Sequence, residues 1–238
     1  MSLLVPITDF LLAENAKHPI DGEVLYIGHQ QIFGKDPGIK HKVLDQSDYE
    51  GAEIIWDLGY PVPETLQDRF DFIYNGGCLD NMFNPAQALM NFTQMLKPRG
   101  RLVCMESASS FNSPYLMYSP AWFWDYFDVN NFVEWKVYIC SYRNAKELMY
   151  GPWKWFEYDR DKDKNGPAPE ARNNHVLVVS CARKGAHTTH DVQPIQYQYR
   201  KDAGGFKMPS SLVHKVTDAL GITLYKSNSY LRPVERFE

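Results

Sequence analysis

The residue types best suited to chemistry stand at the ends of a series of short apolar runs. These residues are Gly28, Asp45, Asp57, Asn75 and Glu106. The carboxylate of Asp45 is suited to accept hydrogen bonds from ribose hydroxyls, and that of Asp57 to accept one from an adenine amino group. Gly28 has no side chain, so a ligand there could approach the backbone. A single acidic residue after a strand is often only a solvated strand end, but the series as a whole favours a ligand site.

The runs that precede these residues are interpreted as strands of one sheet. They span residues 23–27, 42–44, 53–56, 70–74 and 101–105. Nearly continuous apolar runs of this length are typical of strands buried on both faces of a parallel sheet. Ligands of open α/β sheets bind outside the carboxyl ends of the strands. The sequence therefore predicts an α/β fold that brings the five residues to one edge of the sheet.

Helices are expected between some of these strands but not all. A short helix is predicted within residues 1–20. The clearest helix runs over 85–96, where Pro85 suits the first helical position and Asn84 can cap it. Residues 97–100 are predicted to form the turn into the next strand. The first two crossovers between strands are too short for a full helix, so the early helices are predicted to be reduced.

The second half of the chain adds a reversed pair of strands. Residues 122–127 are aromatic on nearly every side of a predicted helix, which either covers the sheet or walls a pocket. The runs at 135–142 and 175–182 are predicted to form an antiparallel pair at the end of the sheet. A long polar insertion joins them, and an insertion of this length is often functional.

The chain is predicted to divide at residue 183. Residues 1–183 would form one domain, and residues 184–238 an extension with a short helix near 210–220. The apolar stripe of that helix would dock on the domain or on a second copy of the chain. A homodimer through the extension is therefore one expectation.

Composition and charge narrow the expected partners. Of the 238 residues, 44% are hydrophobic and 23% are charged, which is ordinary globular usage. The formal net charge of -4 gives no broad attraction to a phosphate backbone, so no nucleic-acid partner is expected. No apolar run approaches the roughly 20 residues that a membrane span needs. The four cysteines are widely spaced, which predicts reduced thiols in a cytoplasmic protein and no metal site.

Residues 52–106 resemble the middle of class I S-adenosylmethionine-dependent methyltransferases. The matching motifs are Asp57-Leu58, Pro61-Val62-Pro63, Phe70-Asp71 and Leu96-Lys97-Pro98 followed by Gly100. The order of elements resembles that family over about residues 20–183. The resemblance implies a Rossmann-like methyltransferase fold, with a mostly parallel sheet, an antiparallel last strand and helices on both faces.

The same resemblance implies a set of residues around S-adenosylmethionine. The cofactor-binding residues would be Gly28, His29, Asp45, Asp57, Leu58, Asn75 and Gly76. In that set, Asp45 would hold the ribose and Asp57 would flank the adenine. Asn75 would lie near the methionine portion of the cofactor. Glu106 would face the substrate side.

The sequence departs from the family pattern in two places. The glycine-rich loop reads YIGHQQI over residues 26–32, so Tyr26 replaces the usual acidic residue and two of three glycines are missing. The usual Leu-Glu-His turn reads Leu-Asp-Asn over residues 79–81, which removes the imidazole. The chain is therefore interpreted as a divergent member with a degenerate loop. One alternative is a catalytically inactive protein of the same fold that serves as a binding or scaffold module.

Candidate catalytic and substrate residues follow from these placements. Methyl transfer depends chiefly on positioning, and a general base helps when the acceptor is a hydroxyl. Asp80 and Glu106 are the candidates for that base, with His29 as a third. Tyr115, Tyr118 and Trp122 are predicted to line the substrate site, the alternative being that they are core. Aromatic walls with hydroxyl groups suit a small molecule such as a sugar or a secondary metabolite.

Overall fold

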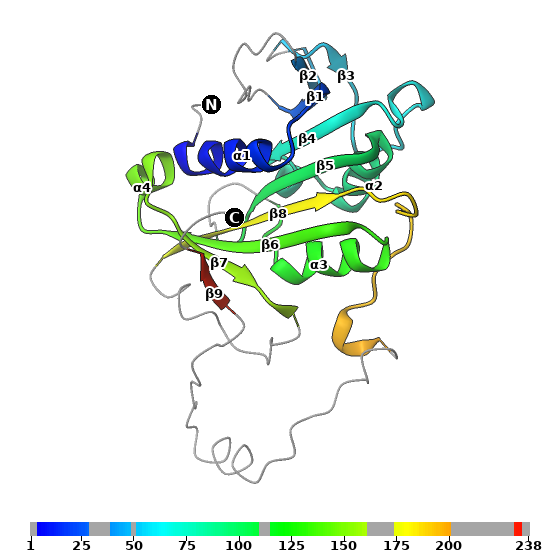
Figure 1. Cartoon of the computed structure of the whole chain (residues 1–238). Helices are drawn as coiled ribbons and strands as arrows, with labels where there is room; N and C mark the ends of the chain where they lie inside the picture. Colours follow the sequence, from blue (N-terminus) through cyan, green and yellow to red (C-terminus); the bar gives the residue numbers. More distant parts are fainter. Residues whose placement is uncertain are drawn as a thin grey trace.

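The computed structural model describes residues 4–28, 39–48, 51–109, 115–160, 174–200 and 231–234. These residues form a nine-stranded sheet with the order β3-β2-β1-β4-β5-β8-β6-β7-β9 (Figure 1). The strands are β1 (Gly22–Ile27), β2 (Ile39–Asp45), β3 (Ile54–Ile55), β4 (Phe70–Gly76), β5 (Leu96–Ser107), β6 (Val133–Tyr142), β7 (Lys154–Tyr158), β8 (His175–Arg183) and β9 (Leu231–Val234). The helices are α1 (Val5–Lys17), α2 (Pro85–Met95), α3 (Pro120–Val129) and α4 (Ala145–Tyr150).

Strand direction confirms the predicted mostly parallel sheet. Strands β1 to β5 pair in parallel, and β8 is inserted antiparallel between β5 and β6. Each of the five apolar runs became one of the first five strands, and the two later runs became β6 and β8. A parallel half followed by one reversed strand is the arrangement that the Rossmann-like methyltransferase resemblance implies.

The far end of the sheet and the entry to β5 differ from the prediction. The β6–β8 pair does not end the sheet, because β7 and β9 extend it beyond β6. β7 comes from the segment expected to be an insertion, and β9 from the extension. Residues 97–100 belong to β5, which pairs with β4 from Leu96 onward with a register shift in place of a turn. The side chain of Asn84 does not cap α2 but donates to the carbonyl oxygen of Gly59 at 3.3 Å.

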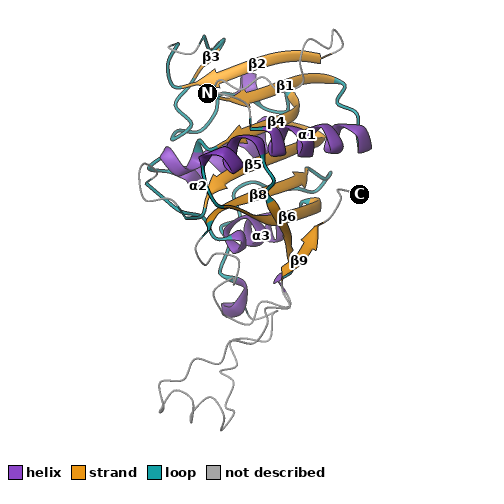
Figure 2. Cartoon of the chain, turned by 90° about the vertical axis from the view of Figure 1, so that its left-hand side faces the viewer, coloured by secondary structure: helices purple, strands orange, loops and turns teal. Residues whose placement is uncertain are grey.

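Two cores cover the two faces of the sheet, because successive residues of a buried strand point to opposite sides. On one face, α1 lies across the middle strands (Figure 2) and packs Phe10 against Tyr138 and Trp155. On the other face, the buried residues of α2 and α3 pack against strand residues such as Leu25 and Ile73. Helices on both faces are thereby confirmed.

The early crossovers contain little helix where the structure describes them. Between β2 and β3, residues 46–48 and 51–53 are bends and loops. Between β3 and β4 the structure has a single 3-10 turn, η1 (Glu64–Leu66). This confirms the reduced helix for the β2–β3 connection, and the β3–β4 connection, for which no such prediction was made, is similar. The crossover from β1 to β2 lies largely outside the described residues.

The first part of the extension runs along α3 instead of leaving the sheet. The hydroxyl of Tyr126 donates to the carbonyl oxygen of His190 at 3.0 Å, and Asn130 donates to that of Val192 at 2.9 Å. Further along, the backbone N–H of Tyr197 donates to Asp125 at 3.2 Å. The helix near 210–220 lies outside the described residues, so the homodimer and the division at residue 183 stay predictions. No helix of the described segments combines the length and apolar character needed to cross a membrane.

Candidate active site

The predicted strand-end residues lie along one edge of the sheet, here called the carboxyl edge. It is formed by the ends of β3, β2, β1, β4 and β5, which are neighbours in that order and all parallel. Ile27 pairs with Leu44 on one side and with Asn75 on the other. The structure therefore brings Gly28 to the centre of this edge, with Asp45 and Asn75 on its two sides.

Gly28 is required by the backbone conformation at the end of β1. Its φ angle is +72°, a region that side chains of L-residues rarely allow. A Cβ atom built at this position would meet no atom of a described residue within 4 Å, so none of these residues fills the space beside it. The next residue, His29, lies outside the described residues.

Asp45 and Asp57 are held by neutral donors from their own turns. Oδ1 of Asp45 accepts the backbone N–H of Ser47 at 3.1 Å. Oδ1 of Asp57 accepts that of Gly59 at 2.8 Å, and its other oxygen lies 3.4 Å from the side-chain nitrogen of Gln46. Both carboxylates are therefore oriented without being neutralised.

Asn91 on α2 fixes the loop that carries Asp57, and sequence reasoning missed it. Its side-chain N–H groups donate to the carbonyl oxygens of Leu58 at 2.9 Å and Tyr60 at 2.8 Å. Its oxygen accepts the backbone N–H of Val62 at 3.2 Å. The available signal was a polar residue on the apolar face of a helix. The Leu58 side chain itself is buried in the core beneath α2.

Glu106 anchors the loop after β4 from below. Its side chain is 1% exposed and accepts the backbone N–H groups of Leu79 at 3.2 Å and Asp80 at 3.0 Å. The side-chain nitrogen of Asn75 donates to the same carboxylate, and the oxygen of Asn75 accepts the backbone N–H of Cys78. Burial, with the nearby charge of Asp80, raises the pKa of Glu106 well above its usual range. Gly76, the last residue of β4, leads directly into this loop.

Asp80 sits above Glu106 in the 3-10 turn η2 (Leu79–Asn81). Its oxygens accept the backbone N–H of Ser107 at 3.4 Å and the side-chain N–H of Asn81 at 2.7 Å. Desolvation by burial raises the pKa of Asp80. The structure thus stacks both predicted catalytic carboxylates at the ends of β4 and β5, with Glu106 deeper.

The predicted substrate residues separate into the buried Tyr118 with the half-buried Trp122 beside it, and the exposed Tyr115. Tyr118 is buried, donates its hydroxyl to the carbonyl oxygen of Leu79 at 2.9 Å and packs edge-on against Trp122 at 4.9 Å. Tyr115 is 70% exposed and meets Phe83 edge-on at 6.2 Å. Phe83, which is 94% exposed, was also missed from the sequence, and its place just after η2 was the only signal.

The four acidic side chains of this edge share an electrostatic feature. These are Asp45, Asp57, Asp80 and Glu106. None of them forms an ion pair with any residue in the part of the chain that the structure describes. Their hydrogen bonds come from backbone N–H groups and side-chain amides. Within the same described segments, no group of three His, Cys, Asp or Glu residues is arranged to hold a metal ion.

Comparisons with known proteins give only distant likenesses. No family model and no curated protein matches this sequence. A methyltransferase-like structure from Bacillus halodurans C-125 aligns with a TM-score of 0.49 at 14% identity, over 75% of this chain and 99% of that one. Phosphoethanolamine N-methyltransferase 2 from Haemonchus contortus, solved with S-adenosyl-L-methionine, aligns with a TM-score of 0.46 at 14% identity, over 74% of this chain.

A structure from a different enzyme class also matches in part. A zinc-dependent alcohol dehydrogenase-like protein from Rhodobacter sphaeroides aligns with a TM-score of 0.37 at 17% identity, over 44% of this chain. The chain spans 52% of the Haemonchus protein and 47% of the Rhodobacter protein. The strand order, with β8 reversed between β5 and β6, confirms the expected Rossmann-like methyltransferase fold independently of these alignments.

Proposed function

We propose that this chain is an S-adenosylmethionine-dependent methyltransferase that acts on a small molecule and binds its cofactor at the carboxyl edge. One observation carries the proposal. The carboxylates of this edge are oriented by neutral hydrogen-bond donors and face no cation among the described residues. Such an edge attracts a ligand that carries positive charge and hydroxyl donors, as the sulfonium and ribose of S-adenosylmethionine do.

The residues present fit that cofactor in three respects. Asp45 keeps an oxygen that accepts no hydrogen bond from a described residue, which suits a ribose hydroxyl. The open space beside Gly28 allows a close approach to the backbone. Asn75 and Gly76 stand at the end of the neighbouring strand, where the methionine portion would lie. We retain Asp57 and Leu58 for the adenine, and His29 as a loop contact.

S-adenosylmethionine, when bound, supplies an electrophilic methyl group on its sulfonium. Within this chain, Asp80 is suited to accept a proton from the acceptor, because a carboxylate with a raised pKa is a stronger base. We propose that Glu106 acts mainly through Asp80, since its oxygens already accept three hydrogen bonds from the loop and from Asn75. Removing Glu106 would release η2 and with it the position of Asp80.

The acceptor is proposed to be a small molecule with a planar or apolar face, such as a secondary metabolite or a sugar. The buried Tyr118 and the half-buried Trp122 support this as an aromatic wall next to the turn that carries Asp80. Tyr115 and Phe83 add an exposed aromatic pair close to the same turn. Tyr115 is linked to η2 through its neighbour, because the backbone N–H of Leu116 donates to the carbonyl oxygen of Asp80 at 3.2 Å.

We further propose a cytoplasmic location. All four cysteines are free, and three of them are buried. Unpaired thiols are typical of proteins kept in a reducing compartment. Fractionation of the source cells, followed by detection of the chain, tests this directly.

Calorimetric titration with S-adenosylmethionine tests the cofactor site. The variant Asp45→Asn keeps the oxygen that accepts from Ser47 but loses the charge, and we expect it to bind about tenfold more weakly than the wild type. Asp48→Asn removes an exposed charge from the same turn and serves as the matched control, with affinity unchanged. A folded wild type that binds no cofactor would contradict the proposal.

Turnover separates the enzyme from the inactive alternative. Formation of S-adenosylhomocysteine in the presence of a panel of hydroxyl and amine acceptors reports methyl transfer. Tight cofactor binding without turnover on any acceptor would favour a binding or scaffold role. Turnover that disappears in Asp80→Asn, with cofactor affinity kept, would support Asp80 as the base.

A further inference from the structure

A second cluster of charges lies at the opposite edge of the sheet, here called the amino edge. At this edge β5 and β6 begin and β8 ends (Figure 1). The C-terminal end of α1 lies beside them and is hydrogen-bonded to Arg101 of β5. A cavity of about 300 Å³ opens there. Its charged lining residues are Glu14, Lys17, Arg101, Glu134, Lys136 and Arg183. A cavity of this volume is at the lower end of the range for small-molecule sites.

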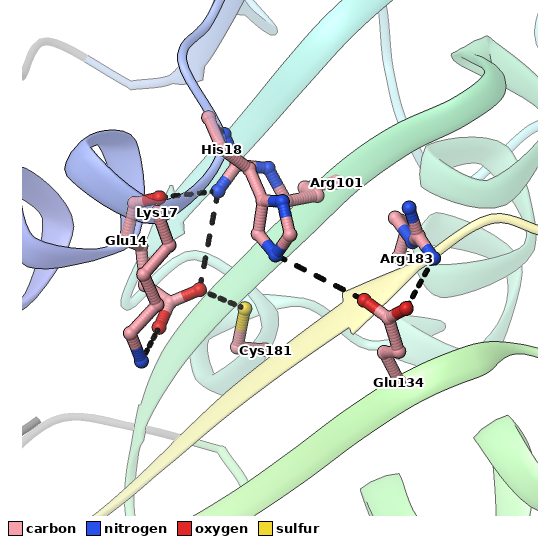
Figure 3. Close-up of polar contacts among 7 residues, drawn as sticks. All are labelled: Glu14, Lys17, His18, Arg101, Glu134, Cys181 and Arg183. Carbon is pink, nitrogen blue, oxygen red and sulfur yellow. Dashed lines mark hydrogen bonds and ion pairs between the residues drawn. The ribbon is translucent and has the colours of Figure 1, made fainter. Parts of the chain in front are cut away.

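One wall of the cavity is built by Arg101 and the end of α1. The Arg101 side chain is 5% exposed and donates to the carbonyl oxygen of Glu14 at 2.7 Å and to that of His18. Its guanidinium thereby adds hydrogen bonds to carbonyl groups at the helix terminus, where the helix itself supplies few donors. The carboxylate of Glu14 takes an ion pair from Lys17 at 3.3 Å (Figure 3). This wall is rigid and already formed.

The facing wall depends on an irregularity in β6. Between the pairs Val133–Arg183 and Lys136–Cys181, β6 contains one residue more than β8. Glu134 sits in this bulge with a φ angle of +54°, a conformation that is strained for a glutamate. The bulge directs its carboxylate to Arg183 and toward the His18 imidazole, 3.9 Å away (Figure 3). Bulges of this kind often re-aim a side chain at a binding site.

The charges of the lining do not balance. Four Lys or Arg side chains line the cavity against two Glu side chains, and the carboxylate of Glu157 pairs with one of the four, Lys136, at 3.7 Å from outside the lining. The Sγ of Cys181 lies 3.5 Å from Glu14 and adds no negative charge, because burial raises the pKa of this thiol well above its usual range. The Nε of Arg183 is buried and has no hydrogen-bond partner within the described residues. The cavity thus holds an excess of positive charge and an N–H group that needs an acceptor.

We propose that this amino-edge cavity binds a small phosphate monoester. A phosphate group matches the remaining excess of positive charge, and its several acceptor oxygens suit the N–H of Arg183 that lacks a partner among the described residues. The guanidinium of Arg183 suits phosphate because its donors form a planar fork, and Lys17 adds a point charge from the other wall. The ligand is independent of the cofactor proposed for the carboxyl edge, since no residue of one site belongs to the other.

Titration of the full chain with glycerol phosphate, inorganic phosphate and malonate tests the site. We expect saturable binding of the two phosphates and weaker binding of the dicarboxylate. Arg183→Gln is expected to weaken phosphate binding about tenfold. Lys17→Gln, at a more exposed position where folding is not at risk, is expected to weaken it as well. Circular dichroism confirms that each variant is folded.

Lys97→Gln is the matched control. It removes a positive charge from the same edge, but Lys97 pairs with Asp71 and does not line the cavity. Phosphate affinity is expected to stay unchanged in this variant. Absence of phosphate binding to the folded wild type would overturn the proposal, and so would an equal loss in Lys97→Gln, which would mean diffuse attraction to the edge. Preferential binding of malonate would overturn the assignment to phosphate.

Discussion

Carboxylates occur at both edges of the sheet, and the two sets are held in opposite ways. At the amino edge, Glu23 pairs with Arg69 at 2.9 Å and Asp71 with Lys97 at 2.8 Å. At the carboxyl edge, the carboxylates of Asp45 and Asp57 accept, among the described residues, only from backbone N–H groups and a side-chain amide. The hydrogen bonds orient them but leave their negative charge in place. The comparison indicates that these carboxylates of the amino edge are paired with cations within the fold, whereas the negative charge of Asp45 and Asp57 at the carboxyl edge is available to a ligand.

The largest effect on stability is expected from a substitution of Arg101 at the amino edge. Arg101→Met removes the guanidinium donor from the carbonyl oxygens of Glu14 and His18 and breaks the buried ion pair between Arg101 and the Glu14 carboxylate. Breaking a buried ion pair from one side is strongly destabilising, so we expect a loss of about 3 kcal/mol in the free energy of unfolding. Urea denaturation followed by circular dichroism measures it. A loss no larger than that of an exposed lysine would mean that Arg101 does not secure α1.

A smaller effect of opposite sign is expected at the carboxyl edge. The folded protein raises the pKa values of Asp80 and Glu106, so both groups hold their protons more tightly when folded than when unfolded. The free energy of unfolding therefore falls as pH rises above the ordinary carboxyl range of about 4. Asp80→Asn removes one of these groups and the charge that raises the pKa of the other. We expect this variant to gain about 1 kcal/mol at neutral pH.

The pH dependence distinguishes this gain from a general improvement in packing. The difference between Asp80→Asn and the wild type should shrink as the pH falls and vanish below about 4, where Asp80 becomes protonated in both the folded and the unfolded state. Urea denaturation at several pH values measures the trend. A variant that is less stable than the wild type at neutral pH would show that the charge of Asp80 stabilises the loop. The charge of this carboxylate would then be used within the fold, as at the amino edge, and the proposed difference between the two edges would be wrong for Asp80.

The smallest effect is expected from an exposed pair of the amino edge. Lys97→Gln removes the partner of Asp71, but both side chains are partly exposed and screened by solvent. Exposed ion pairs contribute little, so the expected loss is about 0.5 kcal/mol or less. Thermal denaturation at low and high salt measures it, and the difference should vanish at high salt. A loss near that of Arg101→Met would show that burial does not determine how much each ion pair of this edge contributes to the free energy of unfolding.

Much of the fold could be predicted because it depends on buried apolar runs. β1, β2, β4 and β5 are stretches whose hydrophobic residues face both cores, so composition alone marks them. β7 and β9 carry no comparable signal. β7 is short and aromatic, and β9 contains Pro233, a residue usually found at sheet edges. Their pairing depends on contacts between distant segments, which local pattern does not contain.

The sequence predicted at which edge of the sheet the candidate site lies, but not how deeply each of its side chains is buried. Ligands of open α/β sheets lie at the carboxyl ends of the strands. Because this rule needs only the strand boundaries, it correctly predicted that Gly28, Asp45 and Asn75 lie at one edge. It could not tell that Glu106 would be covered by η2, because that depends on how a turn folds back over its strand. Asn91 and Phe83 were missed because their roles arise from the loops that they touch.

The pairing of β9 with β7 has a consequence for biosynthesis. A ribosome completes β7 long before it reaches β9, so the outer edge of β7 stays unpaired while the intervening chain is made. Unpaired strand edges in partly made chains are sites where molecules associate wrongly. A nascent chain that stalls before residue 231 would therefore expose the unpaired edge of β7, which is prone to aggregation, although its central strands are already complete. The pairing of β9 with β7 can therefore form only after translation has passed residue 234.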